Sequence, residues 1–152
     1  MVARPFSIAS LLVETSSLRP HVRPGVVALK AKDRQLVEAT ERKNIQDSID
    51  LDEASRVDHP QENRWDYIVS VPRYSRLVGI EPHPARDGEV KVVIAKRKFA
   101  MTLLRHHLPP RHRVGRWLWA SHGRVGFSRM ERVRRLLDQN GIEFIGRLVK
   151  SL

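Results

Sequence analysis

The chain of 152 residues contains no cysteine, and this absence removes several kinds of chemistry at once. Without thiols, the protein can form no disulfide bridge, hold no zinc ion through thiolates and use no cysteine nucleophile. Any metal ion that it binds must therefore be held by oxygen or imidazole ligands.

Long apolar runs are missing as well. The N-terminal stretch MVARPFSIASLLVETSSL has one Arg, a proline and several polar residues, so it lacks the continuous apolar region of a signal peptide. No segment approaches the roughly 18 consecutive apolar residues that are typical of a membrane-spanning helix. We therefore expect a cytoplasmic protein with no membrane partner.

Positive charge is abundant but lies at one end of the chain. Residues 1–95 hold 14 basic and 14 acidic residues, whereas residues 96–152 hold 14 basic and 3 acidic ones. A segregated positive field attracts polyanions through phosphate contacts and counterion release. We expect nucleic acid as the partner, DNA in preference to RNA. The alternatives are an anionic membrane, an acidic protein, or a solvated surface with no electrostatic role.

Seven arginines are candidate nucleic-acid contacts, because the guanidinium group forms bidentate hydrogen bonds with phosphate. Three of them recur every third residue in an expected helix and four precede it: Arg111, Arg113, Arg116, Arg124, Arg129, Arg132 and Arg135. Such a surface would follow the phosphate backbone without reading bases.

Hydrophobic periodicity indicates one α/β domain at residues 29–152, preceded by an irregular arm at residues 1–28. Helices are expected at residues 29–45, 87–107 and 128–140. For the last of these, Ser128 and Glu131 have the spacing of a capping box, and Gly141 is the expected stop.

Strands are predicted where β-branched and aromatic residues are dense. They are expected at residues 64–71, 76–83, 114–120 and 142–152. The first two are separated by a short turn, which indicates a hairpin. Trp117 and Trp119 alternate within the third strand, which is more typical of core residues than of a base-stacking surface.

Two carboxylates stand out because each lies alone within an apolar strand. Asp66 and Glu81 are placed so that the hairpin can bring them together on one face, and His83 projects to the same side as Glu81. A carboxylate among core residues is costly unless it is paired or binds a cation. The structural alternative for the carboxylates is strand-end hydrogen bonds or an ion pair with an arginine such as Arg64 or Arg76. His83 would then be an ordinary core or turn residue.

The order of helix, hairpin strands carrying Asp66 and Glu81-x-His83, helix, strand, helix and strand resembles the αβββαβ core of PD-(D/E)xK nucleases. This restriction-endonuclease-like core is a central mixed sheet flanked by helices. The resemblance covers residues 29–150. It implies a hydrolase that cleaves phosphodiester bonds of DNA or RNA, with Mg²⁺ or Mn²⁺ held by Asp66 and Glu81. His83 stands where the family has a lysine that orients and activates the attacking water.

Lys96 is a candidate replacement for that lysine. It follows Val93 by three residues and precedes Ala100 by four, so it shares the buried face of the expected helix. A lysine moved to this helix resembles a variation within the superfamily, which implies catalytic roles for Lys96 and His83. Glu41 or Glu38 would be an added acidic residue.

The rival interpretation is a catalytically inactive nuclease-fold module that binds nucleic acid or a protein partner. The replacement of the family's lysine by His83 favours this rival. The sequence leaves the oligomeric state open, including a homodimer.

Overall fold

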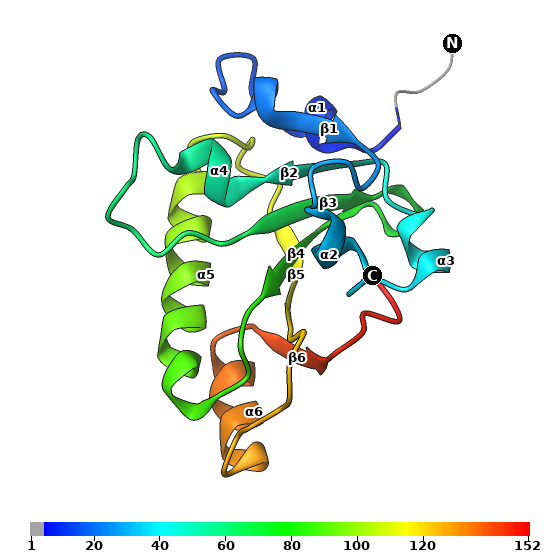
Figure 1. Cartoon of the computed structure of the whole chain (residues 1–152). Helices are drawn as coiled ribbons and strands as arrows, with labels where there is room; N and C mark the ends of the chain where they lie inside the picture. The colour runs from blue at the N-terminus through cyan, green and yellow to red at the C-terminus, as the bar shows by residue number, and fades with distance from the viewer. Residues whose placement is uncertain (1–4) are drawn as a thin grey trace.

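A six-stranded mixed sheet organises the chain, and its strands lie side by side in chain order. The computed structural model describes residues 5–152. The strands are β1 (Val22–Pro24), β2 (Asp47–Asp50), β3 (Tyr67–Val71), β4 (Arg76–Pro82), β5 (Val114–Ala120) and β6 (Glu143–Gly146). Neighbours from β1 to β4 are antiparallel, whereas β4, β5 and β6 run parallel. The protein is therefore an α/β protein with a mixed sheet, as the sequence predicted (Figure 1).

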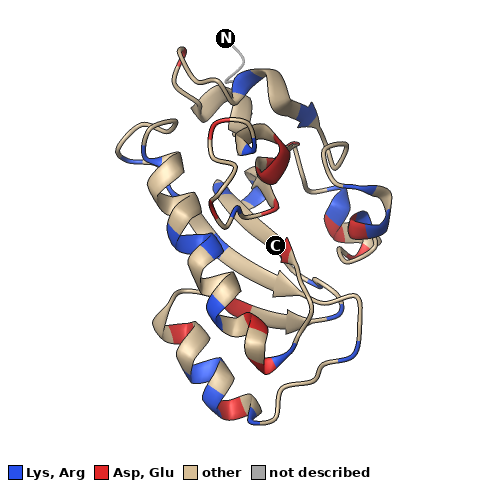
Figure 2. Ribbon diagram, turned by 60° about the vertical axis from the view of Figure 1, so that its left-hand side comes forward, with Lys and Arg blue, Asp and Glu red and all other residues tan. Residues whose placement is uncertain are grey.

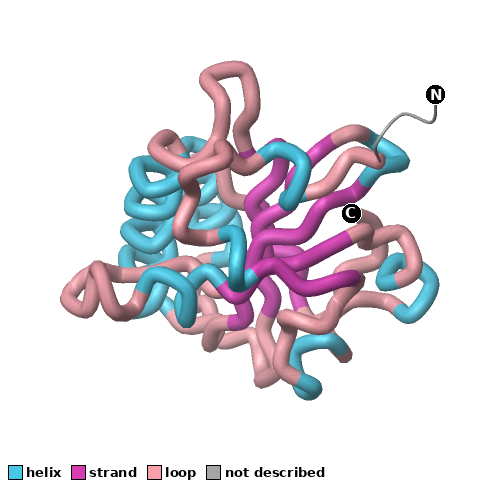
Figure 3. Tube along the Cα trace, turned by 90° about the horizontal axis from the view of Figure 1, so that it is seen from above, coloured by secondary structure: helices cyan, strands magenta, loops and turns pink. Residues whose placement is uncertain are grey.

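Two helices make the crossovers that parallel strands require. Helix α5 (Val90–Leu104) connects β4 to β5, and α6 (Met130–Gln139) connects β5 to β6. Both pack on one face of the sheet, while α2 (Ala31–Arg34) and α3 (Ala39–Arg42) lie on the other side (Figures 1 and 3).

The remaining helical elements are short. They are α1 (Ile8–Leu11), α4 (Leu51–Ser55) and the 3-10 helices η1 (Arg19–His21), η2 (Pro72–Tyr74) and η3 (Asp87–Glu89). Of the helices within residues 5–152, none is long and apolar enough to cross a membrane.

The core has two layers because side chains alternate between the faces of each strand. Ile68 and Leu77 face the layer beneath α5 and α6, whereas Val69 and Val78 face the opposite layer. The tryptophans of β5 are almost fully buried, which confirms that they are core residues. The α5 face of the sheet is also the face to which Glu81 of β4 belongs.

The central hairpin and the second helix confirm the sequence pattern. Strands β3 and β4 pair antiparallel in a register that sets Tyr67 opposite Ile80, and η2 joins them. Strand β5 has the predicted bounds, and η3 with α5 occupies the expected helix at residues 87–107. Helix α5 buries Val93 and Ala100, which flank Lys96 on this face.

Helix α6 ends as predicted but begins differently. The N–H of Ile142 donates to Leu137 and that of Gly141 to Asp138, with Gly141 at φ 70°, which is a Schellman motif. The expected capping box is wrong, because the residue at the N-cap is Arg129 and its side chain makes no cap hydrogen bond. The Ser128 hydroxyl instead donates to Asp87 at 2.6 Å, which ties the start of α6 to η3.

The helix expected at residues 29–45 is wrong. This segment forms the single turns α2 and α3, and between them Val37 bridges to Val149 near the C-terminus. The N–H of Glu38 donates to the carbonyl of Val149 at 2.9 Å, and Val149 donates in turn to Leu36. Hydrogen bonds to a distant segment thus replace those of a continuous helix, and tertiary contacts override local propensity.

The two ends of the chain also differ from expectation. Residues 1–28 were expected to be irregular, but the described part contains α1 and the edge strand β1, and it buries Ile8 and Leu12. The Asp47 carboxylate accepts the N–H groups of Ile8 and Ala9 at 2.8 and 3.1 Å, which anchors α1 to β2. At the other end, β6 is shorter than the strand predicted at residues 142–152.

Gly79 provides a test of the packing beneath α5. Trp65 and Trp117 meet edge to face there, and an added Cβ would lie 2.7 Å from Trp117 and 2.9 Å from Trp65. We expect Gly79→Ala to lower the free energy of unfolding by about 1–3 kcal/mol, because the rings must move. Urea denaturation measures this change. Gly88→Ala is the matched control, since no atom lies within 4 Å of its added Cβ; an equal loss in both variants would contradict the close packing.

Candidate active site

The carboxylate of Glu81 is the centre of the candidate site. Glu81 lies near the end of β4 and is 0% exposed. Oε1 accepts the N–H of Asp66 at 2.9 Å, and Oε2 lies 2.6 Å from Nζ of Lys96. A buried carboxylate is costly unless its oxygens are compensated, and here both of them are.

Three elements bring the predicted residues together. The pairing of Tyr67 with Ile80 sets Asp66, directly before β3, beside Glu81 on β4. Lys96 reaches them from α5, and its Nζ also lies 3.5 Å from Oδ1 of Asp66. The two carboxylates therefore share one ammonium group instead of forming separate ion pairs. The expected arginine pairs are not observed, because Arg64 pairs with Asp52 at 2.8 Å and Arg76 hydrogen-bonds the C-terminal carbonyl. A strand-end hydrogen bond is present, since the N–H of Asp66 donates to Glu81.

His83 adjoins this group but is held between two carboxylates. Its Nε2 lies 2.7 Å from Glu89 and its Nδ1 lies 3.4 Å from Glu81. Burial favours the neutral ring, but the hydrogen bonds to Glu81 and Glu89 outweigh burial and raise the pKa of His83. His83 thus links Glu81 to η3, and because each ring nitrogen faces a carboxylate, neither is free to activate water.

Charges in the site shift the pKa values of Asp66 and Lys96. Burial, reinforced by the nearby Glu81, raises the pKa of Asp66 to about 7, although Lys96 opposes the shift. Burial alone would lower the pKa of Lys96, but the attraction of Glu81 and Asp66 raises it. Lys96 is therefore a permanent positive charge at neutral pH, and Asp66 exchanges its proton near neutrality.

A cleft of about 730 Å³ opens beside this group at the carboxyl ends of β4 and β5. Asp66 and His83 line it, and loops that follow parallel strands are a common place for ligands. Four exposed basic side chains also line it, and none of them takes part in the salt bridges of the described chain: Lys30, Lys32, Arg86 and Arg124.

The seven arginines predicted from the sequence do not form one surface. Arg124 lines the cleft, whereas Arg111 and Arg113 are exposed before β5, at the opposite end of the sheet. Arg116 does not belong with them, because it binds Glu143 through two hydrogen bonds of 2.9 and 2.8 Å and also contacts the C-terminal carbonyls. Figure 2 likewise shows Lys and Arg spread over helices at both ends of the molecule.

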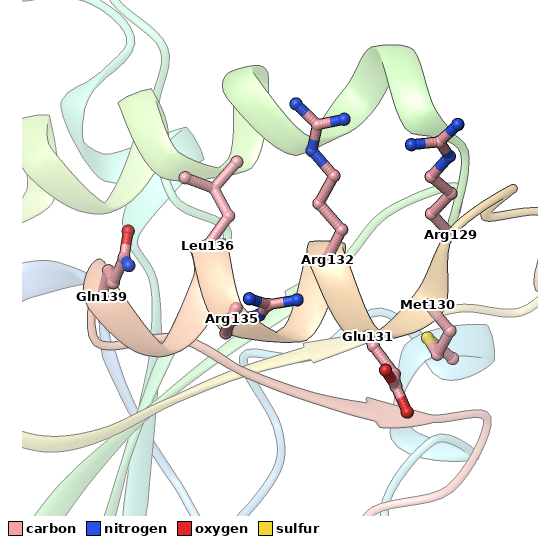
Figure 4. A pocket seen from close by; sticks show the side chains of 7 residues that line it. All are labelled: Arg129, Met130, Glu131, Arg132, Arg135, Leu136 and Gln139. Carbon is pink, nitrogen blue, oxygen red and sulfur yellow. The ribbon is translucent and has the colours of Figure 1, made fainter.

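The other three arginines line a shallow hollow at α6, with Arg129 at its N-cap and Arg132 and Arg135 on the helix. Arg129 and Arg132 project on the same side as Leu136, whereas Glu131 points away from them (Figure 4). The helix begins close to the cleft, since Gly126 bridges to Arg86 of the cleft wall. These arginines can therefore extend the positive surface beyond the cleft, but they do not contact the carboxylates.

Several residues of the cleft were missed from the sequence. Lys30 and Lys32 belong to the charge-neutral part of the chain, and Asp33 and His122 are 89 residues apart yet lie within 2.7 Å. Glu41, the expected added acidic residue, is on α3 and bonds to Asn44 instead of lining the cleft. For these missed residues, the one signal in the sequence was the position of His122 just after a predicted strand.

A divalent cation fits the ligands in part. Within residues 5–152, no three His, Asp or Glu side chains gather as a complete metal site. Asp66 and Glu81 offer two hard oxygen ligands, and Mg²⁺ is often held by one or two carboxylates together with water and substrate phosphate. A cation would compete with Lys96 for Glu81. The residues thus suit Mg²⁺ or Mn²⁺ that substrate helps to hold.

The raised pKa of Asp66 predicts an effect on stability. Between about pH 4 and 7 the folded chain keeps a proton that the unfolded chain has lost, so the free energy of unfolding falls as pH rises. The Asp66→Asn variant has no carboxyl at this position, so its free energy of unfolding does not fall for this reason. We expect its stability relative to wild type to increase by about 2 kcal/mol from pH 5 to 8, less than the full shift implies because 27% of the side chain is exposed. Urea denaturation in EDTA measures the difference, and His83 titrates in both proteins. If the difference in the free energy of unfolding between the two proteins stayed constant with pH, the raised pKa of Asp66 would be refuted.

Comparisons with known proteins identify no relative of this chain. No family model, curated protein or solved structure matches it. What the site can do must therefore follow from the chemistry of Asp66, Glu81 and Lys96 and from the charges around their cleft.

Proposed function

We propose that this protein is a metal-dependent nuclease that hydrolyses phosphodiester bonds, in DNA in preference to RNA. One observation carries the proposal: Asp66 just before β3, Glu81 on β4 and Lys96 on α5 meet beside a cleft whose rim carries four basic residues. Two carboxylates and a lysine are groups that hold a divalent cation and stabilise the charge of a reacting phosphate.

The residues divide the work in this proposal. Asp66 and Glu81 would hold Mg²⁺ or Mn²⁺, and such a cation, when bound, polarises phosphate and acidifies an attacking water. Lys96 keeps its positive charge and would contact a phosphate oxygen or orient the water. His83 would act indirectly, because its hydrogen bonds to Glu81 and Glu89 hold the Glu81 carboxylate in place.

The fold proposal is consistent with this chemistry. We infer that the sheet is a variant of the restriction-endonuclease-like core of PD-(D/E)xK nucleases, with Lys96 on α5 in place of the strand lysine. The antiparallel hairpin, the crossover helix and the following parallel strand occur in the expected order. The position of Lys96 against both carboxylates supports the replacement that the sequence suggested.

The cleft is the better candidate for the nucleic-acid backbone than the whole basic C-terminal part. Its basic side chains are exposed and line the same cleft as Asp66, whereas Arg116 is occupied by Glu143. Phosphate contacts of this kind position a substrate without specifying its sequence. Arg129, Arg132 and Arg135 would extend binding along α6.

A binding module without catalysis is the second candidate. It is favoured by the complete burial of Glu81 and by the contacts of its oxygens with Lys96, His83 and the Asp66 backbone. If those contacts persist when substrate binds, the carboxylate cannot receive a cation. Catalysis and binding must therefore be measured separately.

Replacing Glu81 separates the two candidates. With Mg²⁺ or Mn²⁺, we expect wild type to cut DNA, and Glu81→Gln and Glu81→Ala to lose about a hundredfold or more in kcat because a cation ligand is lost. DNA binding in EDTA should change by less than about threefold. Nuclease assays on single- and double-stranded DNA and RNA, with fluorescence anisotropy for binding, measure both.

Glu89→Gln is the matched control for Glu81, because Glu89 also contacts His83 but not Lys96. It should reduce kcat far less than Glu81→Gln. Absence of cleavage by wild type on all substrates would reject the nuclease in favour of the binding module. Loss of DNA binding in Glu81→Gln, with folding intact by circular dichroism, would instead reject the role given to this carboxylate.

The location of the binding surface has a separate test. Replacing Lys30, Arg86 and Arg124 together by Ala should weaken DNA binding by about tenfold or more and reduce its dependence on salt concentration, because up to three phosphate contacts are lost. The control is Arg111→Ala with Arg113→Ala, which removes charge from the opposite end of the sheet. Anisotropy titrations at several salt concentrations compare the two. A larger loss in the control would place the DNA outside the cleft.

A further inference from the structure

A second buried carboxylate lies in the wall of the cleft. Asp33 on α2 is 4% exposed, yet it lines the cleft together with Asp66 and His122. Its Oδ2 accepts the Tyr67 hydroxyl at 2.6 Å, and its Oδ1 lies 2.7 Å from Nε2 of His122. Each oxygen of this carboxylate thus has one side-chain partner.

The Tyr67 hydroxyl holds Asp33 from below. It accepts the N–H of Lys30 at 3.2 Å while donating to Asp33. Burial, strengthened by the hydrogen bond to Asp33, raises the pKa of Tyr67 far above its usual value, so the phenol keeps its proton and remains a donor. The Asp33 carboxylate is therefore fixed between α2 and β3, with Oδ1 directed to the loop after β5.

His122 is the exposed member of this group. It follows β5 by two residues, and 40% of its side chain is exposed although Asp33 is buried. Its Nε2 is occupied by Asp33, whereas Nδ1 has no hydrogen-bond partner among the residues that the structure describes. A buried anchor thus fixes one edge of the imidazole and leaves the other edge available to a ligand.

The surroundings of His122 indicate which ligand. Lys30, Lys32 and Arg124 line the same cleft, and Asp66 marks its catalytic end. With Nε2 turned to Asp33, Nδ1 is the ring nitrogen that a ligand in the cleft can reach. Among basic side chains of this kind, the ligand that charge favours is a phosphate group.

We propose that His122, held by Asp33, is a further substrate-contacting residue whose Nδ1 edge contacts the phosphodiester backbone bound in the cleft. The proposal rests on the part of the proposed function that places nucleic acid in this cleft, but it does not require cleavage. His122 would contact the strand in the part of the cleft that carries Lys30, Lys32 and Arg124, and Asp66 lines the same cleft.

Binding of a fluorescein-labelled 12-nucleotide single-stranded DNA to the full chain in EDTA tests the proposal. We expect His122→Ala to raise Kd about tenfold, as loss of one charge-assisted hydrogen bond does. His122→Gln should raise Kd similarly, because Gln can still donate to Asp33 but offers no imidazole edge. Asp33→Asn should raise Kd less, since the ring stays present but is held less firmly.

His106→Ala is the matched control, because His106 is an exposed histidine just beyond the far end of α5 and should leave Kd unchanged. A second readout is independent of any variant: the ring nitrogen signals of His122 should shift on titration with the same DNA in ¹H–¹⁵N spectra, while those of His106 should not.

The outcomes separate this inference from the nuclease proposal. If wild type binds DNA but never cuts it, and the His122 variants bind it more weakly, catalysis fails and the inference stands. If His122→Ala and His122→Gln bind as wild type does, the inference is overturned whether or not the protein cuts. If His122→Gln binds DNA with the wild-type Kd while His122→Ala does not, His122 has a structural role only and the inference is overturned. If wild type does not bind DNA at all, both proposals are overturned.

Discussion

The site depends on the contacts that the ammonium group of Lys96 makes with the carboxylates of Asp66 and Glu81. Glu81 is fully buried, and Lys96 makes the closest contact with its carboxylate, at 2.6 Å, while also reaching Asp66. Removing one partner of a buried ion pair typically costs about 3–5 kcal/mol, because the remaining charge is left unpaired. The contact therefore also fixes how α5 lies across β3 and β4, which is the geometry that any chemistry at this site requires.

His83 extends this network without sharing its role. Because it lies between Glu81 and Glu89, it connects the end of β4 to η3 and to the start of α5. Lys96 and His83 thus contact the carboxylates from the helix and from the end of the strand. The permanent positive charge of this group comes from Lys96 on α5.

The cleft joins two clusters that the sheet keeps on opposite faces. Asp66 belongs to the face covered by α5, whereas Tyr67, the next residue, points to the other face and binds Asp33. The clusters meet only at the strand ends, where the loops after β4 and β5 bring His83 and His122 to one opening. The four basic residues of the rim likewise come from both parts of the sequence, three of them from residues 1–95 and Arg124 from residues 96–152.

Patterns between near neighbours in the chain were sufficient for much of the site. Alternation along the hairpin predicted that Asp66 and Glu81 share a face, and helical spacing placed Lys96 on the buried side of α5, because both periods are set by local backbone geometry. The stop of α6 at Gly141 followed from the same kind of rule.

The rest was decided by contacts between distant segments. The expected first helix is interrupted where Val37 pairs with Val149. Arg116 forms an ion pair with Glu143, and the Ser128 hydroxyl donates to Asp87 instead of capping α6. The pair of Asp33 and His122 has no local pattern at all. Such contacts form because buried polar groups need hydrogen-bond partners once the layers have packed. Which groups meet depends on the whole fold, whereas periodicity depends only on the neighbouring turns of the chain.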